Sequence, residues 1–167
     1  LVNNDNLIKI FKKGGIDRKP ISVKIYQQSF IHKSYVKKKN YNNKKSIEYD
    51  ICPSNCLNLF DNSNERLEFL GDSIIDSVVV SYLYRRFEDQ DEGFMTKLKT
   101  RLVKTDALAS FSNYIGLSEH LIISKHVEDK CDGRINPRIL EDLFEAFIGA
   151  MFLDFSEMKI KELNSLI

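Results

Sequence analysis

Apolar residues recur every three or four positions along several stretches of the chain, which is the spacing of an amphipathic helix. These stretches are 21–35, 67–87, 94–116 and 137–151. Regular alternation of apolar and polar residues, the sign of a strand, is weak throughout, and no repeat of solenoid length is visible. The pattern therefore predicts an all-α fold, a compact helical bundle.

The stretch 67–87 stands out because it is apolar on nearly all sides, with few polar residues between positions 74 and 84. A helix of this kind is expected in the middle of a bundle, covered by its neighbours. Asn62 and Glu65 precede it with the spacing of a capping box, which predicts that Asn62 is the N-cap. Asn136-Pro137 marks the start of the last strong helix.

The length of 167 residues fits one domain with short additions at its ends. We expect an N-terminal basic arm at 1–20, a helical domain at 21–156 and a closing helix at 157–167. A polar tract rich in Lys and Asn, at about 37–62, interrupts the domain as a long loop or insertion. The first residue is Leu rather than Met, which fits a fragment of a longer protein, so the closing helix is expected to begin a truncated or absent C-terminal region.

Charge is distributed unevenly along the chain. Residues 1–45 hold twelve Lys/Arg and two Asp/Glu, whereas residues 46–167 hold thirteen and twenty-two. A basic N-terminal part on an acidic body predicts a polyanionic partner for the basic part, and cations or basic neighbours for the acids. For the Lys/Asn tract alone, an ordinary solvated loop is the alternative interpretation.

Composition excludes several classes of protein. Hydrophobic residues make up 43% of the chain and charged residues 29%, which is unlike a disordered chain. No apolar run reaches the roughly 20 residues that a membrane-spanning helix needs, and we expect no membrane association. The three cysteines are too few for a disulfide scaffold and favour an intracellular, reducing compartment, either cytoplasm or nucleus.

Acidic residues lie where a buried helix should have none. Glu65, Glu68, Asp72 and Asp76 follow one another at steps of three, four and four, so they share one face of the helix at 67–87. Like charges at this spacing destabilise a helix by roughly 0.2–0.5 kcal/mol per pair, and burying them costs more. Basic partners, shared protons or divalent cations could compensate, and oxygen ligands of this kind suit Mg²⁺.

A second pair of acids, Asp142 and Glu145, lies one turn apart in the last strong helix. If the two helices pack side by side, these residues converge with Glu68 and Asp72 and can hold one or two divalent ions, as in phosphoryl transfer. Ion pairs with surface Lys and Arg are the alternative, and the spacing does not decide between them. Gly71 allows a close helix contact beside the acids, although a simple packing role is equally compatible.

Two long segments resemble one known family. The segment NERLEFLGDS at 64–73 closely resembles the signature of the ribonuclease III family, and ILEDLFEAFIGA at 139–150 resembles a second block of the same family. Weaker resemblances occur at HKSY in 32–35 and EGFMT in 92–96. The resemblance covers about 21–155. The richness in Asn, Lys and Ile suits a family member from a virus or another AT-rich genome.

This resemblance implies a ribonuclease III-type helical endonuclease domain at 21–156 that hydrolyses phosphodiester bonds of double-stranded RNA. The metal-binding catalytic carboxylates it implies are Glu68, Asp72, Asp142 and Glu145. The implied cofactor is Mg²⁺, for which Mn²⁺ can substitute, and the products carry 5′ phosphates and short 3′ overhangs. The alternative is a non-catalytic module with the same fold that binds or assembles on double-stranded RNA. Such a module is expected to have lost these carboxylates, and here all four remain.

The resemblance also implies roles outside the four carboxylates. Glu65 and Glu92 match accessory active-site acids, and Phe69 matches an aromatic residue at the interface of a homodimer. An ordinary core position is the alternative for Phe69. The insertion is longer than is usual in the family, and its lysines are candidate RNA-binding residues. These are Lys37, Lys38, Lys39, Lys44 and Lys45.

Overall fold

The computed structural model of the chain describes residues 1–38, 52, 54 and 56–164, with side chains as far as 156. This part of the chain is helical and contains no β-strand, only two isolated bridges. The prediction of an all-α fold is confirmed. The elements are α1 Asn4–Lys13, α2 Val23–Ser29, η1 Lys33–Tyr35, α3 Glu65–Arg86, α4 Glu92–Leu102, α5 Thr105–Ile115, η2 Leu117–His120, α6 Lys125–Lys130 and α7 Pro137–Asn164.

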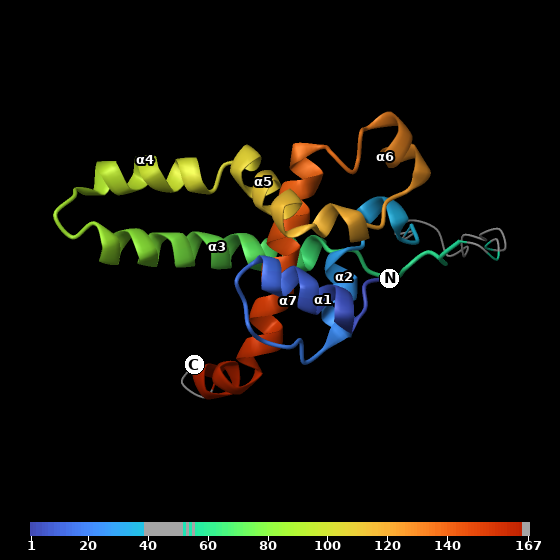
Figure 1. Ribbon diagram of the computed structural model, residues 1–167, viewed down its shortest axis with the longest axis horizontal. Helices are drawn as coiled ribbons and strands as arrows, with labels where there is room; N and C mark the ends of the chain where they lie inside the picture. Colours follow the sequence, from blue (N-terminus) through green and yellow to red (C-terminus); the bar gives the residue numbers. More distant parts are fainter. Residues whose placement is uncertain (39–51, 53, 55, 165–167) are drawn as a thin grey trace.

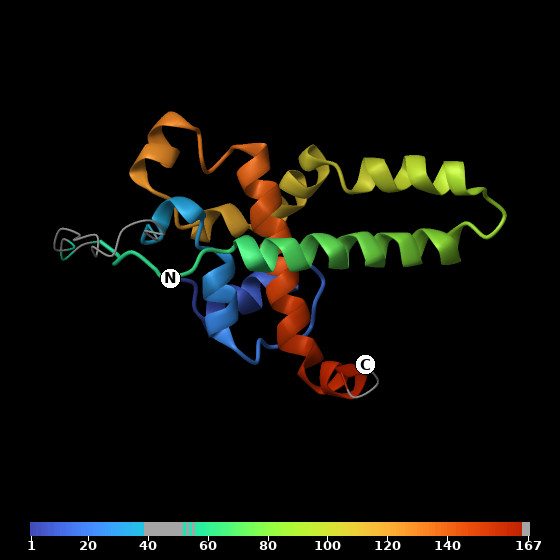
Figure 2. The ribbon, with the colours of Figure 1, turned by 180° about the vertical axis from the view of Figure 1, so that it is seen from behind.

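The helix α7 is the centre of the body. It packs against α3, α5, α2 and η2, and its crossing of α3 is visible from both sides of the molecule (Figures 1 and 2). Its residues Leu140, Leu143, Phe147 and Ala150 are fully buried or nearly so. The ring of Phe147 lies 5.5–6.1 Å from the rings of Tyr26, Phe30 and Phe11. An aromatic core therefore joins the N-terminal helices to α7.

The N-terminal stretch 1–20 differs from the expected arm, because it contains α1 and contributes to the core. Leu7, Ile10 and Phe11 of α1 are buried, whereas the lysines of the helix are exposed. The buried carboxylate of Asp154 on α7 accepts hydrogen bonds from the backbone N–H groups of Ile21 and Ser22 at 2.9 and 2.7 Å. The positive charge that suggested an arm belongs in part to the exposed face of α1. The apolar face of the same helix packs in the core and attaches the stretch to the body.

The prediction that the helix at 67–87 is buried on all sides is wrong for its C-terminal half. Within α3, Leu67, Gly71 and Ile75 are buried, but beyond the crossing with α7 the helix continues as one arm of a hairpin with α4 (Figure 1). Tyr82 and Tyr84 are 59% and 70% exposed there. Leu83 is buried in this half, whereas Val78 and Val80 are 61% and 49% exposed, so only part of its apolar surface is covered within the described part of the chain.

The helix α3 also begins later than the capping-box spacing predicts. Its first residue is Glu65 and Asn64 is at the N-cap, so Asn62 does not cap it. The hydroxyl of Ser63 donates a hydrogen bond to the carboxylate of Glu65 at 2.9 Å. In the predicted capping box, this carboxylate would instead accept from the backbone N–H of Asn62.

The Lys/Asn-rich insertion leaves and rejoins the body at neighbouring points. The backbone N–H of Lys37 donates to the carbonyl of Phe60 at 2.8 Å, and Val36 and Phe60 form an isolated bridge. Most of the insertion lies outside the described residues. At the other end of the chain, α7 is continuous to Asn164, so the segment expected as a separate closing helix extends α7. Within the described residues, none of the helices combines the length and apolar character needed to cross a membrane.

Candidate active site

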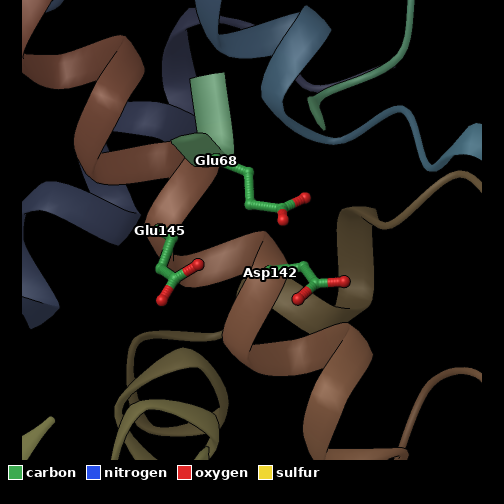
Figure 3. Close-up of side chains that lie close together, drawn as sticks. All are labelled: Glu68, Asp142 and Glu145. Atoms are coloured by element: carbon green, nitrogen blue, oxygen red, sulfur yellow. The ribbon is translucent and has the colours of Figure 1, made fainter. Parts of the chain in front are cut away.

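Three of the predicted carboxylates converge where α3 crosses α7. Glu68 comes from the first turns of α3, and Asp142 and Glu145 come from successive turns of α7 (Figure 3). Each side chain offers a carboxylate oxygen, and these three atoms lie within 4.8 Å of one another. We call Glu68, Asp142 and Glu145 the carboxylate cluster.

Two glycines determine how closely the helices approach at the cluster. A Cβ atom added to Gly71 of α3 would overlap the backbone carbonyl of Glu145, and one added to Gly149 of α7 would overlap the carbonyl of Leu67. The two backbones are therefore in direct contact. This confirms the close helix contact considered for Gly71, and it brings Glu68 against the face of α7 that carries Glu145. The matching role of Gly149 was missed, although a glycine inside an apolar helix is the same signal.

Burial and mutual repulsion disfavour the charged forms of the cluster. Burial, followed by the charge of Asp72, raises the pKa of Glu145 to about 8. Burial, followed by the charge of Asp142, raises the pKa of Glu68 to about 7. Burial also raises the pKa of Asp142, and the positive charge of Lys33 partly opposes this. A divalent cation would remove the repulsion, and all the donor atoms are oxygens, so the residues fit a hard cation such as Mg²⁺.

Asp72, the fourth predicted carboxylate, lies beside the cluster and outside the group of three. Its side chain is exposed on α3, one turn beyond Glu68. Its charge is the largest charge effect on Glu145 and also acts on Glu68. The structure therefore brings three predicted residues together and leaves the fourth close enough to interact with them electrostatically.

The two accessory acids lie far apart. Glu65, at the start of α3, is 3.6 Å from the Nζ of Lys33, and its charge raises the pKa of Glu68. Glu92 is the first residue of α4, at the far end of the α3–α4 hairpin from the crossing with α7 (Figure 1). There it accepts a hydrogen bond from Thr96 at 2.8 Å. Within one chain, only Glu65 lies beside the cluster.

The remaining predicted residues lie on the surface or outside the described part. Phe69 is 79% exposed on α3, so the alternative interpretation as a core aromatic does not hold within this chain. Lys37 is exposed and pairs with Asp61 at 2.9 Å. Lys38 is also exposed. The other three candidate lysines, Lys39, Lys44 and Lys45, lie outside the described residues.

Sequence reasoning missed three charged residues around the cluster. Lys33 lowers the pKa of both Glu68 and Asp142 by its charge. Glu141 has a pKa raised mainly by burial and contributes to the raised pKa of Glu145. Arg138, on the first turn of α7, lowers the pKa of Asp142 by its charge. Lys33 and Glu141 belong to segments that resemble the family, but nothing in the sequence indicated that Lys33 lies beside the acids.

An apolar groove of about 690 Å³ runs between α3, α5 and α7. Its lining includes Ile74 and Val78 of α3, Phe111 of α5 and Phe152 of α7. Phe111 and Val78 are 45% and 61% exposed. The single chain thus exposes apolar side chains in this groove, in addition to Tyr82 and Tyr84 on the α3–α4 hairpin.

Comparison with protein families gives a match to the ribonuclease III domain over residues 65–156. The chain is 36% identical to ribonuclease 3 of Listeria innocua over 133 residues, which are 80% of this chain and 50% of that protein. It is 37% identical to ribonuclease 3 of Staphylococcus aureus, covering 80% of this chain and 47% of that protein. The chain thus spans about half the length of the curated relatives it matches.

Solved structures give the same result. The nuclease domain of ribonuclease III from Campylobacter jejuni superposes with a TM-score of 0.68 at 27% identity, covering 96% of this chain and 91% of that one. Dicer from Pichia stipitis superposes with a TM-score of 0.54 at 25% identity, covering 89% of this chain and 56% of that one. The fold and both acidic segments therefore have relatives among known nucleases.

Proposed function

The chain belongs to the ribonuclease III family, and from this we propose that it is an endoribonuclease that cleaves double-stranded RNA. One observation carries the proposal: the carboxylate oxygens of Glu68, Asp142 and Glu145 lie within 4.8 Å of one another. Mutual repulsion makes such a cluster costly to keep without a function. A non-catalytic module that only binds RNA has no use for it.

We propose that Glu68, Asp142 and Glu145, with Asp72 beside them, hold a divalent cation, Mg²⁺ or in its place Mn²⁺. When bound, such an ion lowers the pKa of a water molecule and stabilises negative charge on the phosphate of a phosphodiester bond. The donor set supports this assignment, because hard cations prefer carboxylate oxygens.

The residues of the chain itself fix the geometry of the site. The contact at Gly71 and Gly149 keeps α3 and α7 at one separation, so Glu68 and Glu145 face each other without rearrangement. Burial of Glu145, which is 9% exposed, limits access of bulk water to that side of the cluster. Without a cation, the raised pKa values favour protonation of Glu145, and in part of Glu68, near pH 7, and a bound cation would favour release of these protons.

We propose that the active form is a homodimer. Phe69, Tyr82, Tyr84 and Tyr114 are each more than half exposed, which is unusual for a monomer. The apolar groove adds further exposed apolar side chains, Val78 and Phe111, that a second copy of the chain could cover. A two-fold dimer carries two clusters, which fits cleavage of both strands of a duplex to leave 5′ phosphates and short 3′ overhangs. The similar nuclease domain from Campylobacter jejuni has a structurally flexible region involved in dimer formation.

The proposal is tested by incubating the purified chain with end-labelled long double-stranded RNA and with matched single-stranded RNA. Each RNA is offered with Mg²⁺, with Mn²⁺ and with a chelator. We expect cleavage of the duplex only, with either metal ion and not with the chelator. Binding of the duplex without cleavage under every condition would instead support a non-catalytic RNA-binding module.

A further inference from the structure

Lys33 lies at the edge of the carboxylate cluster on a segment that comes from elsewhere in the sequence. It is the first residue of η1, whereas the cluster belongs to α3 and α7. Its Nζ atom is 3.6 Å from Oε1 of Glu65, and both side chains are more than half exposed. This distance is too long for a strong hydrogen bond, so the ammonium group remains accessible to another anion.

The backbone around Lys33 is held by a partly buried network of hydrogen bonds. The N–H of His32 donates to the carbonyl of Ile122 at 3.0 Å, and the hydroxyl of Ser34 accepts from the N–H of Ser124 at 2.9 Å. The N–H of Ser34 donates to Nδ1 of His32 at 3.2 Å. Burial, and then the charge of Lys33, lowers the pKa of His32, so this imidazole is a neutral acceptor. A fixed backbone with an exposed cationic side chain is a suitable arrangement for binding a ligand.

The positive charge of Lys33 acts on one side of the cluster. Lys33 is the largest charge effect on Asp142, and it also opposes the shift of Glu68. It is not among the largest charge effects on Glu145, which come first from Asp72 and then from Glu141. The cluster therefore has a side with a lysine and a side with further acids.

This polarity matters for a polyanionic substrate. RNA carries one negative charge per nucleotide, and acids around a metal site repel every phosphate except the one that the metal holds. A cation at the edge of the cluster can hold the neighbouring phosphate and so position the strand. Glu65, Asp72 and Glu141 add further negative charge around the cluster. A lysine beside the cluster would offset part of the repulsion that these acids exert on RNA phosphates.

We propose that Lys33 binds a phosphate of the RNA strand next to the one being cleaved. The inference rests on the proposed function, because it assumes that double-stranded RNA is the substrate. It gives Lys33 the role of a substrate-binding residue.

The test compares Lys33→Met, Lys33→Arg and Lys9→Met with the unaltered chain. Lys9 is an exposed lysine on α1, a helix that contributes nothing to the cluster, so it controls for a general loss of positive charge. Duplex binding is measured by fluorescence anisotropy in a Glu145→Gln background with Mg²⁺, at several salt concentrations. Cleavage kinetics are measured without that substitution.

We expect Lys33→Met to weaken duplex binding about ten-fold and to reduce the slope of log affinity against log salt by about one. KM should rise with kcat nearly unchanged, Lys33→Arg should restore most of the loss, and Lys9→Met should behave like the unaltered chain. The thermal unfolding temperature of Lys33→Met should equal that of the unaltered chain, because exposed ion pairs contribute little to stability.

Unchanged affinity and salt slope in Lys33→Met would overturn the inference and leave Lys33 as a surface ion pair. A lower kcat with unchanged duplex binding would also overturn the inference. Lys33 would then affect the carboxylates of the cluster by its charge and would not bind the RNA. A chain that does not cleave, but binds duplex in a way that depends on Lys33, would refute the proposed function alone. A chain that binds no duplex at all would refute both.

Discussion

The acids of the cluster differ from ordinary surface acids because the fold raises their pKa values. For Glu145 and Glu68 these values are about 8 and 7, with burial as the main cause. The sequence indicated a shared face from steps of three and four residues. It could not show burial, which depends on how α3 and α7 cross, nor that Asp72 would remain exposed.

These shifts predict a pH dependence of the metal-free protein. Between about pH 4.5 and 8 the folded chain holds protons on Glu68 and Glu145 that the unfolded chain releases. Stability should therefore fall as pH rises through this window and level off above it. Thermal unfolding with a chelator at pH 5 to 9 measures this. Added Mg²⁺ should stabilise the protein most at the alkaline end, because the ligands must lose their protons to bind it.

Asp72 offers a sharper version of the same experiment. Its charge is the leading charge contribution to the raised pKa of Glu145, so Asp72→Asn should lower that pKa. The fall in stability of the metal-free protein should then still begin near pH 4.5, which the unfolded chain sets, but it should end at lower pH and be smaller in total than in the unaltered chain. The comparison uses the same unfolding measurements, with Glu145→Gln as the control that should reduce the pH dependence most. An unmoved profile in Asp72→Asn would mean that Asp72 lies too far from Glu145 to act on it.

At the scale of the elements, the crossing of α3 and α7 is the feature on which the site depends. Alanine is a better helix former than glycine by about 1 kcal/mol, so Gly71→Ala would stabilise an isolated α3. In the folded chain the new Cβ would overlap the carbonyl of Glu145. Overpacking costs about 1–3 kcal/mol, so the substitution should destabilise the protein and separate the acids.

The prediction is that Gly71→Ala lowers the unfolding temperature and reduces cleavage even where the protein is fully folded. Gly93→Ala is the matched control, because the nearest atom to an added Cβ there is Oδ1 of Asp91 at an ordinary 3.5 Å. Circular dichroism melts and cleavage assays on both variants make the comparison. Equal behaviour of the two variants would show that the contact at Gly71 is not tight.

A second link between elements holds the N-terminal helices to α7. The buried carboxylate of Asp154 accepts from two backbone N–H groups before α2 and from the hydroxyl of Tyr26 at 2.9 Å. Removing it leaves three donors without their partner, at a cost of about 1–3 kcal/mol each when they stay buried. Of the three, only the hydroxyl of Tyr26 is fully buried, so Asp154→Ala should destabilise the chain by about 1–3 kcal/mol, as measured by urea unfolding. A loss below about 1 kcal/mol would mean that these hydrogen bonds contribute little to attaching α2 to α7.

The elements themselves were largely predictable from the sequence, and their surroundings were not. Helical spacing located α3 and α7, and Pro137 marked the start of α7. The same spacing could not show that Val78, Tyr82 and Tyr84 in the second half of α3 are exposed, since the sequence pattern of an apolar residue does not depend on what covers it. Similarly, the basic charge of 1–20 suggested an arm, although α1 within it has an apolar face. Three buried residues of this ten-residue helix are enough to attach it to the body.

At the scale of the whole molecule, the exposed apolar surface predicts self-association. Phe69 is 79% exposed, so Phe69→Glu should leave the fold of the chain intact while placing a charge in the proposed interface. We expect the unaltered chain to sediment as a dimer and Phe69→Glu as a monomer with much reduced cleavage. Ile135→Glu is the control, because Ile135 is 72% exposed on the loop before α7. A monomeric unaltered chain would contradict the dimer.

The measurement that tests the central claim most directly is single-turnover cleavage of an end-labelled RNA duplex by the chain and by Glu145→Gln. The substitution keeps the size of the side chain and removes the charge from the cluster. We predict Mg²⁺-dependent cleavage by the unaltered chain and a loss of about 1,000-fold or more in the variant, with unfolding and duplex binding preserved. Cleavage by Glu145→Gln at an undiminished rate would contradict the assignment of the carboxylate cluster as the active site.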